Sequence, residues 1–272
     1  MNNQEEGSSS LSKTAFIVTK EYRRFAEFCD ACRPTGYIGI CYGPPGVGKT
    51  LSARHYALWD LIEPRLPRQA DYLPLPPEIA FCQTVFYTPS VTNTPRAIAD
   101  EIRESRLMLG RFVNEANPNS GMKWPPTDAC KLLIVDEADR LKFNSLEQVR
   151  DIYDRGQIGL VLIGMPGLEK SLARFPQLYS RVGFAHPFKP LGAEEMFFLL
   201  EHKWSQLGLT LQRDDFTDAE AVAAIIRMTG GNLRLVQRLF TQIERILKIN
   251  GLQTVSCEVV EAARECLVIG TQ

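Results

Sequence analysis

The sequence predicts an α/β fold: a parallel sheet with helices on both faces, followed by a small all-helical domain. Short apolar strands alternate with helical segments from residue 14 to residue 191, and this alternation is typical of a parallel sheet with helical connections. After residue 191 only helical periodicity remains. We therefore expect a polar, disordered tail over 1–13, an α/β domain over 14–191 and a helical domain over 192–272.

The apolar runs and turn signals place the elements in order. Five strands are expected at 37–42, 82–88, 131–136, 160–164 and 182–185. Thr19 caps the first expected helix, which Pro34 ends. Further helices are expected at about 49–62, 96–109, 145–154, 168–175, 193–206, 218–229, 232–249 and 256–267. Two connections predict loops: 63–80, which holds five prolines, and 110–128, which is rich in turn residues.

The charge balance, the hydropathy and the cysteines indicate which binding partners and which cellular compartment to expect. The 272 residues carry 31 Lys and Arg against 32 Asp and Glu, so nucleic acid would have to be bound by a local patch. No apolar run approaches the length of a membrane span, and the polar, acidic start is unlike a signal peptide. We expect a cytoplasmic protein with no membrane partner. Cys29 and Cys32 favour one helix face, with a metal or redox site as the alternative.

Residues 43–50, GPPGVGKT, match the pattern G-x-x-x-x-G-K-[ST] between an expected strand and an expected helix. Glycines let backbone N–H groups point at phosphate oxygens, and the following helix directs its N-terminal dipole at them. Lys49 is expected to neutralise the β and γ phosphates, and Thr50 to offer a hydroxyl to Mg²⁺. The alternative is a glycine-rich turn. The predicted cofactor-binding residues, for ATP with Mg²⁺, are Gly43, Pro44, Pro45, Gly46, Val47, Gly48, Lys49, Thr50 and Leu51.

Residues 132–137, LLIVDE, predict a buried strand that ends in two carboxylates. Asp136 is the second candidate metal ligand, and Glu137 is the candidate general base or water-orienting group. Alone, the pattern is equally compatible with a solvated strand end. Its place, 86 residues after the glycine loop with room for two strands between, favours a site that hydrolyses ATP.

These two motifs and the helical domain resemble the AAA+ ATPases over about residues 14–267. The resemblance implies the sheet order 5-1-4-3-2 and an active site between neighbouring subunits of a homo-oligomer. Through GGNLR at 230–234 it implies that Arg234 reaches the γ phosphate, and through LYSRVG that Arg181 is the arginine finger, with Arg174 as its rival. Ordinary helix or surface arginines are the alternatives. LIGMP at 162–166 lacks the Asn or Thr common at sensor 1, which implies slow turnover.

The sequence of residues 132–184 resembles that of transposition regulators of the MuB, TniB and TnsC kind. This resemblance implies an ATPase that binds double-stranded DNA largely without sequence specificity and assembles into a ring or helical filament. It also implies a transposase partner and, beyond it, a target-selection adaptor. The alternatives are a replication, helicase-loading or secretion-type ATPase, and a nucleotide-switched assembly protein with little turnover.

DNA contacts are expected on loops. Thr92, Thr94 and Arg96 open the helix after the second strand, where hydroxyl, backbone N–H and guanidinium groups can meet phosphates without reading bases. Further candidates are Arg103, Arg111 and Lys123. Acidic residues share this helix, so a solvated charged face is the alternative for each basic residue.

Overall fold

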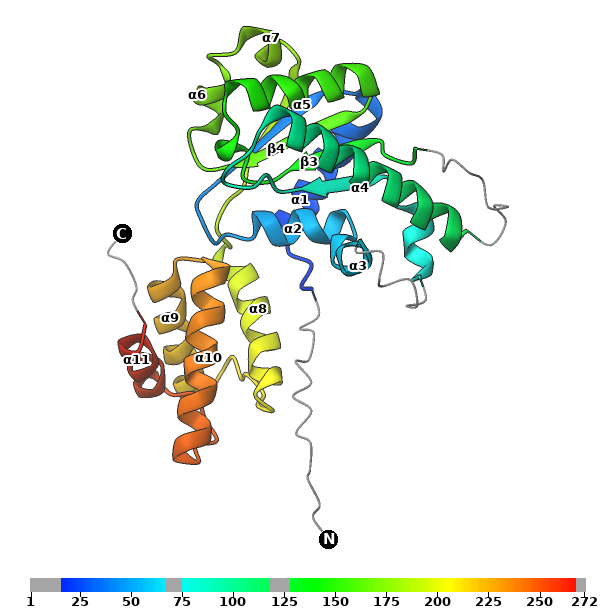
Figure 1. The fold of residues 1–272 in the computed structure, drawn as a ribbon. Helices are drawn as coiled ribbons and strands as arrows, with labels where there is room; N and C mark the ends of the chain where they lie inside the picture. The colour runs from blue at the N-terminus through cyan, green and yellow to red at the C-terminus, as the bar shows by residue number, and fades with distance from the viewer. Residues whose placement is uncertain (1–15, 67–74, 118–127, 268–272) are drawn as a thin grey trace.

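A computed structural model describes residues 16–66, 75–117 and 128–267. Its centre is a five-stranded sheet with the order β2-β3-β4-β1-β5, in which every neighbouring pair is parallel (Figure 1). The strands are β1 Ile38–Tyr42, β2 Thr84–Tyr87, β3 Leu132–Val135, β4 Gly159–Gly164 and β5 Val182–Pro187. The expected order 5-1-4-3-2 is confirmed.

Helices cover both faces of this sheet. They are α1 Lys20–Thr35, α2 Lys49–Tyr56, α3 Trp59–Ile62, α4 Pro95–Ala116, α5 Phe143–Gly156, α6 Leu168–Leu172 and α7 Pro176–Tyr179. In Figure 1, α4 and α5 lie in front of the sheet and α1 lies behind it. Every residue of β2, β3 and β4 is buried, as expected of strands covered on both faces. The edge strand β5 instead alternates between half-buried and exposed residues.

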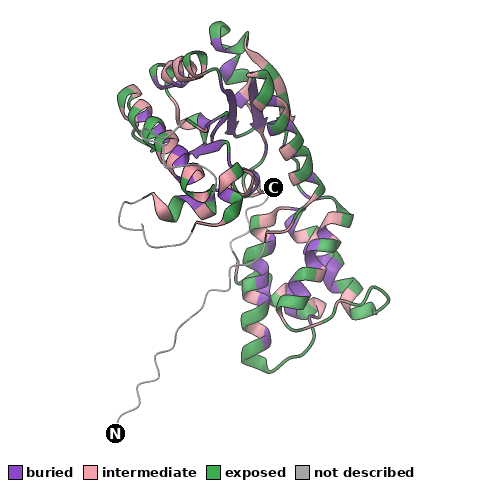
Figure 2. Ribbon diagram, turned by 90° about the vertical axis from the view of Figure 1, so that its right-hand side faces the viewer, coloured by how far each residue is buried: buried purple, intermediate pink, exposed green. Residues whose placement is uncertain are grey.

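The helical part contains α8 Ala193–Gln206, α9 Phe216–Thr229, α10 Leu233–Asn250 and α11 Cys257–Glu265. Buried residues form two separate hydrophobic clusters, one drawn from residues 25–188 and one from 191–263 (Figure 2). This separation supports a domain boundary near residue 191, which we propose. Among the described helices, none is both long and apolar enough to span a membrane.

The helix expected over 168–175 ends at Leu172 as α6, and a separate helix that was not expected, α7, begins at Pro176. Two more helices differ from the prediction. α4 continues to Ala116, so the expected loop over 110–128 was wrong in its first part. Gly110 suggested a turn, but the apolar spacing of the helix continues through Leu109 to Phe112, and both are buried. The expected helix over 49–62 is divided between α2 and α3 at Leu58, whose φ of 51° is left-handed. In both cases tertiary packing overrides local propensity.

The loop expected over 63–80 contains two short 3₁₀ helices in its described residues, Glu63–Arg65 and Pro77–Phe81. Cys29 and Cys32 are free thiols buried on α1, and burial raises the pKa of Cys32 to about 12. Within the described ranges, no three His, Cys, Asp or Glu residues are grouped so that they could hold a metal ion. Cys29 and Cys32 both belong to the hydrophobic cluster that α1 helps to form, which supports the helix-face interpretation.

Candidate nucleotide-binding site

The glycine loop leaves the end of β1 and enters α2, whose first residue is Lys49. Lys49 is 9% exposed, and its ammonium group donates hydrogen bonds to the carbonyl oxygens of Gly43 (2.6 Å) and Pro44 (2.8 Å). Burial lowers its pKa. Because an ammonium group has three protons, one remains for a phosphate oxygen. Two carbonyl groups of the glycine loop thus orient the side chain of Lys49. The sequence motif alone does not show these two hydrogen bonds.

The two candidate metal ligands lie side by side. Asp136 follows β3, and its N–H donates to the carbonyl of Tyr87 in β2 (2.8 Å). The Thr50 hydroxyl donates to Oδ2 of Asp136 (2.7 Å), and the Glu137 N–H donates to Oδ1 (2.9 Å). Asp136 is 3% exposed, and burial raises its pKa while these hydrogen bonds oppose the rise. One hydroxyl and one carboxylate fit Mg²⁺, which takes few protein ligands and completes its shell with phosphate oxygens and water.

Glu137 has a left-handed backbone, with φ 49° and ψ 44°. This conformation is unusual for a residue with a side chain and is found at functional sites. It begins the 3₁₀ turn Ala138–Arg140, which returns the Arg140 guanidinium to the Glu137 carboxylate as an ion pair. The candidate base is therefore half-exposed and paired.

The end of β4 explains the missing sensor 1 side chain. Oδ2 of Asp139 accepts a hydrogen bond from the N–H of Met165 (2.7 Å). A Cβ on Gly164 would lie 2.3 Å from the same oxygen. The carboxylate of Asp139 therefore occupies the space into which a side chain at residue 164 would extend. Asp139 was not among the predicted site residues, although it is the third acid of the DEAD run that follows β3.

The start of α10 packs on the glycine loop. The N–H of Arg234 donates to the carbonyl of Gly46 (3.0 Å), and the side-chain amide of Asn232 donates to the carbonyl of Pro45 (2.8 Å). A Cβ on Gly46, whose φ is 80°, would lie 2.5 Å from Asn232 Oδ1 and 2.9 Å from Arg234 Cβ. This close approach requires glycine. It places Arg234 beside the glycine loop. Its action at the γ phosphate stays a prediction.

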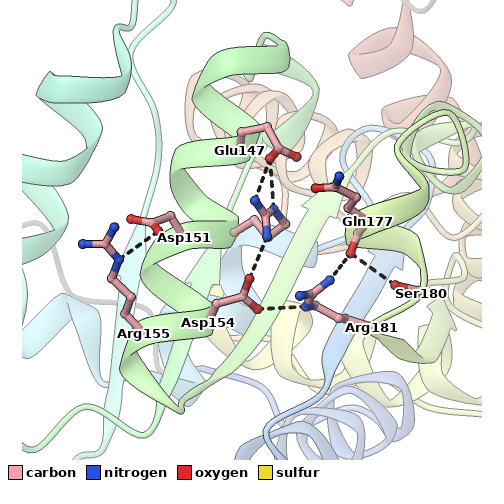
Figure 3. Close-up of polar contacts among 8 residues, drawn as sticks. Glu147, Asp151, Asp154, Arg155, Gln177, Ser180 and Arg181 are labelled. Carbon is pink, nitrogen blue, oxygen red and sulfur yellow. Dashed lines mark hydrogen bonds and ion pairs between the residues drawn. The ribbon is translucent and has the colours of Figure 1, made fainter.

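Arg181 lies between α7 and β5, among residues of α5 and α7 (Figure 3). Its Nε lies 2.8 Å from Oδ1 of Asp154, and its guanidinium also donates to the carbonyl of Gln177. In Figure 1, α7 lies at the end of the α/β part away from α8–α11. The structure does not bring Arg181 to its own glycine loop, so its action on a neighbouring subunit stays a prediction. The rival Arg174 is exposed.

The candidate DNA contacts divide into two groups. Thr92, Thr94 and Arg96 are exposed around the start of α4, and the Thr94 hydroxyl caps the helix by accepting from Ala97 N–H (3.2 Å). Arg96 also lies 3.9 Å from Asp100 in a loose ion pair. In the second group Arg103 is paired with the same Asp100 (2.8 Å), Arg111 is paired with Glu115 (2.7 Å), and Lys123 lies outside the described residues. Fifteen residues of helix separate Arg111 from Arg96, about 22 Å. Thr92, Thr94 and Arg96 are therefore the residues that most simply form a single DNA-contact surface.

Comparison with known proteins gives the family. A family model described as an AAA domain matches residues 33–172, more than half of the chain. A Staphylococcus aureus protein named "Potential ATP-binding protein" is 46% identical over 266 residues, which cover 94% of this chain and 97% of that protein. The Mu-like prophage FluMu DNA transposition protein B of Haemophilus influenzae is 24% identical over 238 residues, 83% of this chain and 71% of that one.

Similar solved structures show the same fold. The RuvB Holliday junction branch migration motor of Thermotoga maritima superposes with a TM-score of 0.59 at 17% identity, covering 93% of this chain and 71% of that one. The Aeropyrum pernix ORC1 protein in complex with DNA has a TM-score of 0.54 at 18% identity, covering 94% and 67%. The sheet order, the glycine loop and the matched AAA domain agree. The chain therefore belongs to the AAA+ family of P-loop ATPases.

Proposed function

We propose that this chain is an ATP-dependent DNA-binding ATPase that regulates DNA transposition. It would assemble as a homo-oligomer on double-stranded DNA and recruit or activate a transposase, with a target-selection adaptor as a further partner. The observation that carries the ATPase part is the convergence of Lys49, Thr50 and Asp136 beside Glu137. The transposition part is supported by the 24% identity to the Haemophilus protein.

Each group of the site has a separate role in the proposed hydrolysis of ATP. Backbone N–H groups of the loop and the third proton of Lys49 bind the phosphates, while Thr50 and Asp136 hold Mg²⁺. When bound, Mg²⁺ offsets negative charge on the β and γ phosphates. Glu137 accepts a proton from the attacking water, or orients that water. Arg234, on the helix that packs against the loop, would contribute charge at the γ phosphate.

DNA binding would use phosphate contacts around the start of α4. Thr92, Thr94 and Arg96 are exposed there and present hydroxyl and guanidinium groups, which suit phosphates rather than base edges. Because the net charge is −1, the affinity has to come from this local surface. Binding should therefore weaken steeply with added salt and depend little on sequence.

The test measures steady-state ATP hydrolysis with and without duplex DNA, together with DNA binding with and without ATP. We expect ATP-dependent binding to duplexes of unrelated sequence and faster hydrolysis on DNA. Equal DNA binding without nucleotide, or protection of one sequence alone, would count against the proposal. The Lys49→Ala variant serves as the background for hydrolysis.

A second candidate is a nucleotide-switched assembly protein with little turnover. The specific observation that favours it is Gly164, which offers no polar side chain for water positioning at the end of β4. In that case ATP would drive assembly on DNA while hydrolysis stays at the Lys49→Ala background. The same experiment distinguishes the two candidates.

A further inference from the structure

A carboxylate of the helical part caps the first helix of the α/β part. Oε1 of Glu195, in the first turn of α8, accepts hydrogen bonds from the N–H groups of Lys20 (2.8 Å) and Glu21 (3.3 Å), the first two residues of α1. The first N–H groups of a helix have no partner within it, and the Thr19 hydroxyl accepts from the next one, that of Tyr22 (3.0 Å). A distant side chain therefore completes the cap of α1. We call the two hydrogen bonds of Glu195 to α1 the α1–α8 contact.

The same carboxylate also caps its own helix. Oε2 of Glu195 accepts from the N–H of Gly192 (3.3 Å), the residue directly before α8. One oxygen thus serves each helix, and the N-terminal dipoles of α1 and α8 both favour a negative charge at this point. Glu195 therefore holds together the starts of two helices that belong to different parts of the chain.

Two further contacts support the helical part at the same end of α1. Glu21 is 4% exposed, and its Oε1 accepts from the N–H of Lys189 (3.1 Å), in the segment 188–192 that joins β5 to α8. Ile17, just before α1, packs against the hydrophobic cluster of the helical part. The start of α1 is therefore a docking point for the helical part.

The helical part touches the α/β part at a second place, where Asn232 and Arg234 at the start of α10 hydrogen-bond the glycine loop. Residues of α8 and α10 belong to one hydrophobic cluster, so the two docking points favour the same orientation. We propose that Glu195 is a positioning residue for nucleotide: the α1–α8 contact holds the helical part in the orientation that brings α10 onto the loop. This inference rests on the proposed ATP-binding site and names a residue outside it that sets its affinity.

The expected kinetic signature follows from the population of the docked arrangement. When only a fraction of the molecules holds the binding-competent arrangement, the apparent affinity for the ligand falls by that fraction. Saturating ATP restores the arrangement, because ATP binds the docked molecules more tightly. Loss of the α1–α8 contact should therefore raise KM while kcat is regained at saturation. A residue needed only for folding would instead lower the amount of active protein and leave KM unchanged.

The test measures kcat and KM for ATP, with ATP affinity by titration, in wild type, Glu195→Ala and Glu194→Ala. Glu195→Ala should raise KM about three- to tenfold, equivalent to the net contribution of one hydrogen bond. Glu194 is the matched control: its ion pair with Lys20 (3.1 Å) joins side chains that are 88% and 64% exposed. Ion pairs this exposed contribute little, so Glu194→Ala should match wild type.

A conservative variant protects the test against simple loss of folding. Glu195→Gln keeps one acceptor oxygen, which can serve α1 or Gly192 but not both, so its KM should lie between those of wild type and Glu195→Ala. Thermal unfolding shows whether each variant is folded. If Glu195→Ala does not fold, the KM and kcat of Glu195→Gln decide.

A double-mutant cycle with Asn232→Ala tests whether the two docking points act through one orientation. Independent losses of ATP affinity would multiply. A shared orientation predicts a larger loss in the Glu195→Ala, Asn232→Ala double variant, because the first substitution removes the excess stability of the docked arrangement and the second then acts in full.

The outcomes separate this role from the proposed ATP site. Wild-type KM in the folded Glu195 variants, a lower kcat at constant KM, or losses in the double variant that simply multiply would overturn the positioning role, while ATP binding by wild type leaves the proposed site standing. Failure of wild type to bind ATP would instead overturn the proposed site, and with it this inference.

Discussion

The side-chain amide of Asn232 donates a hydrogen bond to the carbonyl of Pro45, 2.8 Å away, and so joins α10 to the glycine loop. Its Oδ1 accepts from the N–H groups of Arg234 (3.1 Å) and Leu235 (3.3 Å), which caps the same helix. One side chain therefore both begins α10 and docks it on the loop that we propose binds phosphate.

Two substitutions at residue 232 separate these roles. Asn232→Ala should lower the free energy of unfolding by about 1 kcal/mol through loss of the cap and weaken ATP binding about fivefold through loss of the docking hydrogen bond. Asn232→Ser retains a good cap but is too short to reach Pro45, so it should weaken ATP binding while keeping most of the stability. Urea unfolding and nucleotide titration measure the two quantities. Unchanged ATP affinity in both variants would contradict a docking role.

The motifs around the site are local in sequence, and that is why they could be predicted. A glycine loop between a strand and a helix, and an acid at the end of an apolar strand, each carry their structural context within about ten residues. The alternation of strands and helices likewise predicted a parallel sheet, and the AAA+ resemblance supplied its order, which the structure confirms.

The contacts that were missed depend on elements distant in the chain. Asp139 meets Met165 only because β3 and β4 are neighbours in this register. Asn232 meets Pro45 across 187 residues. No periodicity or spacing reports such pairs. The left-handed Leu58 was also invisible, because a leucine rarely adopts that backbone conformation and only packing around it decides.

Lys49 and Glu137 should fail in different ways. Lys49→Ala removes the main cation for the phosphates, so ATP binding should be lost. Glu137→Gln keeps the shape of the side chain but cannot accept a proton, so ATP should bind and remain unhydrolysed, with the assembled state trapped. Nucleotide binding and single-turnover hydrolysis measure the difference. Equal loss of binding in both variants would contradict these assignments.

Gly164 should resist substitution because Asp139 fills the adjacent space. In Gly164→Ala the new Cβ would meet the carboxylate, which must then leave the Met165 N–H; we expect a loss of about 1 kcal/mol or more in unfolding free energy. Asp139→Ala combined with Gly164→Ala should cost less than the sum of the two single changes, because the truncated side chain leaves room for the new Cβ. A Gly164→Ala variant as stable as wild type would refute the close contact.

Stability should fall in mild acid because of His186. This ring packs against Phe25, Phe28 and Phe188, with Nε2 3.3 Å from Oε1 of Glu21. Burial lowers its pKa, and the nearby Glu21 carboxylate only partly opposes this. The unfolded state therefore binds more protons below about pH 6.5, so stability is complete above that pH and declines as pH falls. His186→Phe should flatten the dependence of urea unfolding on pH between about 7 and 5; parallel curves would contradict it.

Arg181 tests whether the site is completed by a second subunit. An arginine that reaches a neighbour's γ phosphate stabilises charge developing in the transition state, a contribution on the order of a thousandfold or more. Arg181→Ala should therefore retain ATP affinity while losing turnover and nucleotide-driven assembly. Asp154→Ala removes the ion-pair partner within the chain but keeps the Arg181 guanidinium, which still donates to the carbonyl of Gln177, so this variant should retain turnover. If Arg181 served only to hold α5, both variants would lose activity alike.

Mixing Arg181→Ala with Lys49→Ala decides the matter. Each variant alone should be inactive, but a mixed assembly can place the intact Lys49 and Glu137 of one subunit opposite the intact Arg181 of the other. Some turnover should then return, in proportion to the number of such composite interfaces, provided that the Lys49→Ala subunit assembles without its own nucleotide. Light scattering shows whether mixed assemblies form. If they form and no turnover returns, the role in trans is refuted, and the arginine to test next is the exposed Arg174 on the segment between α6 and α7.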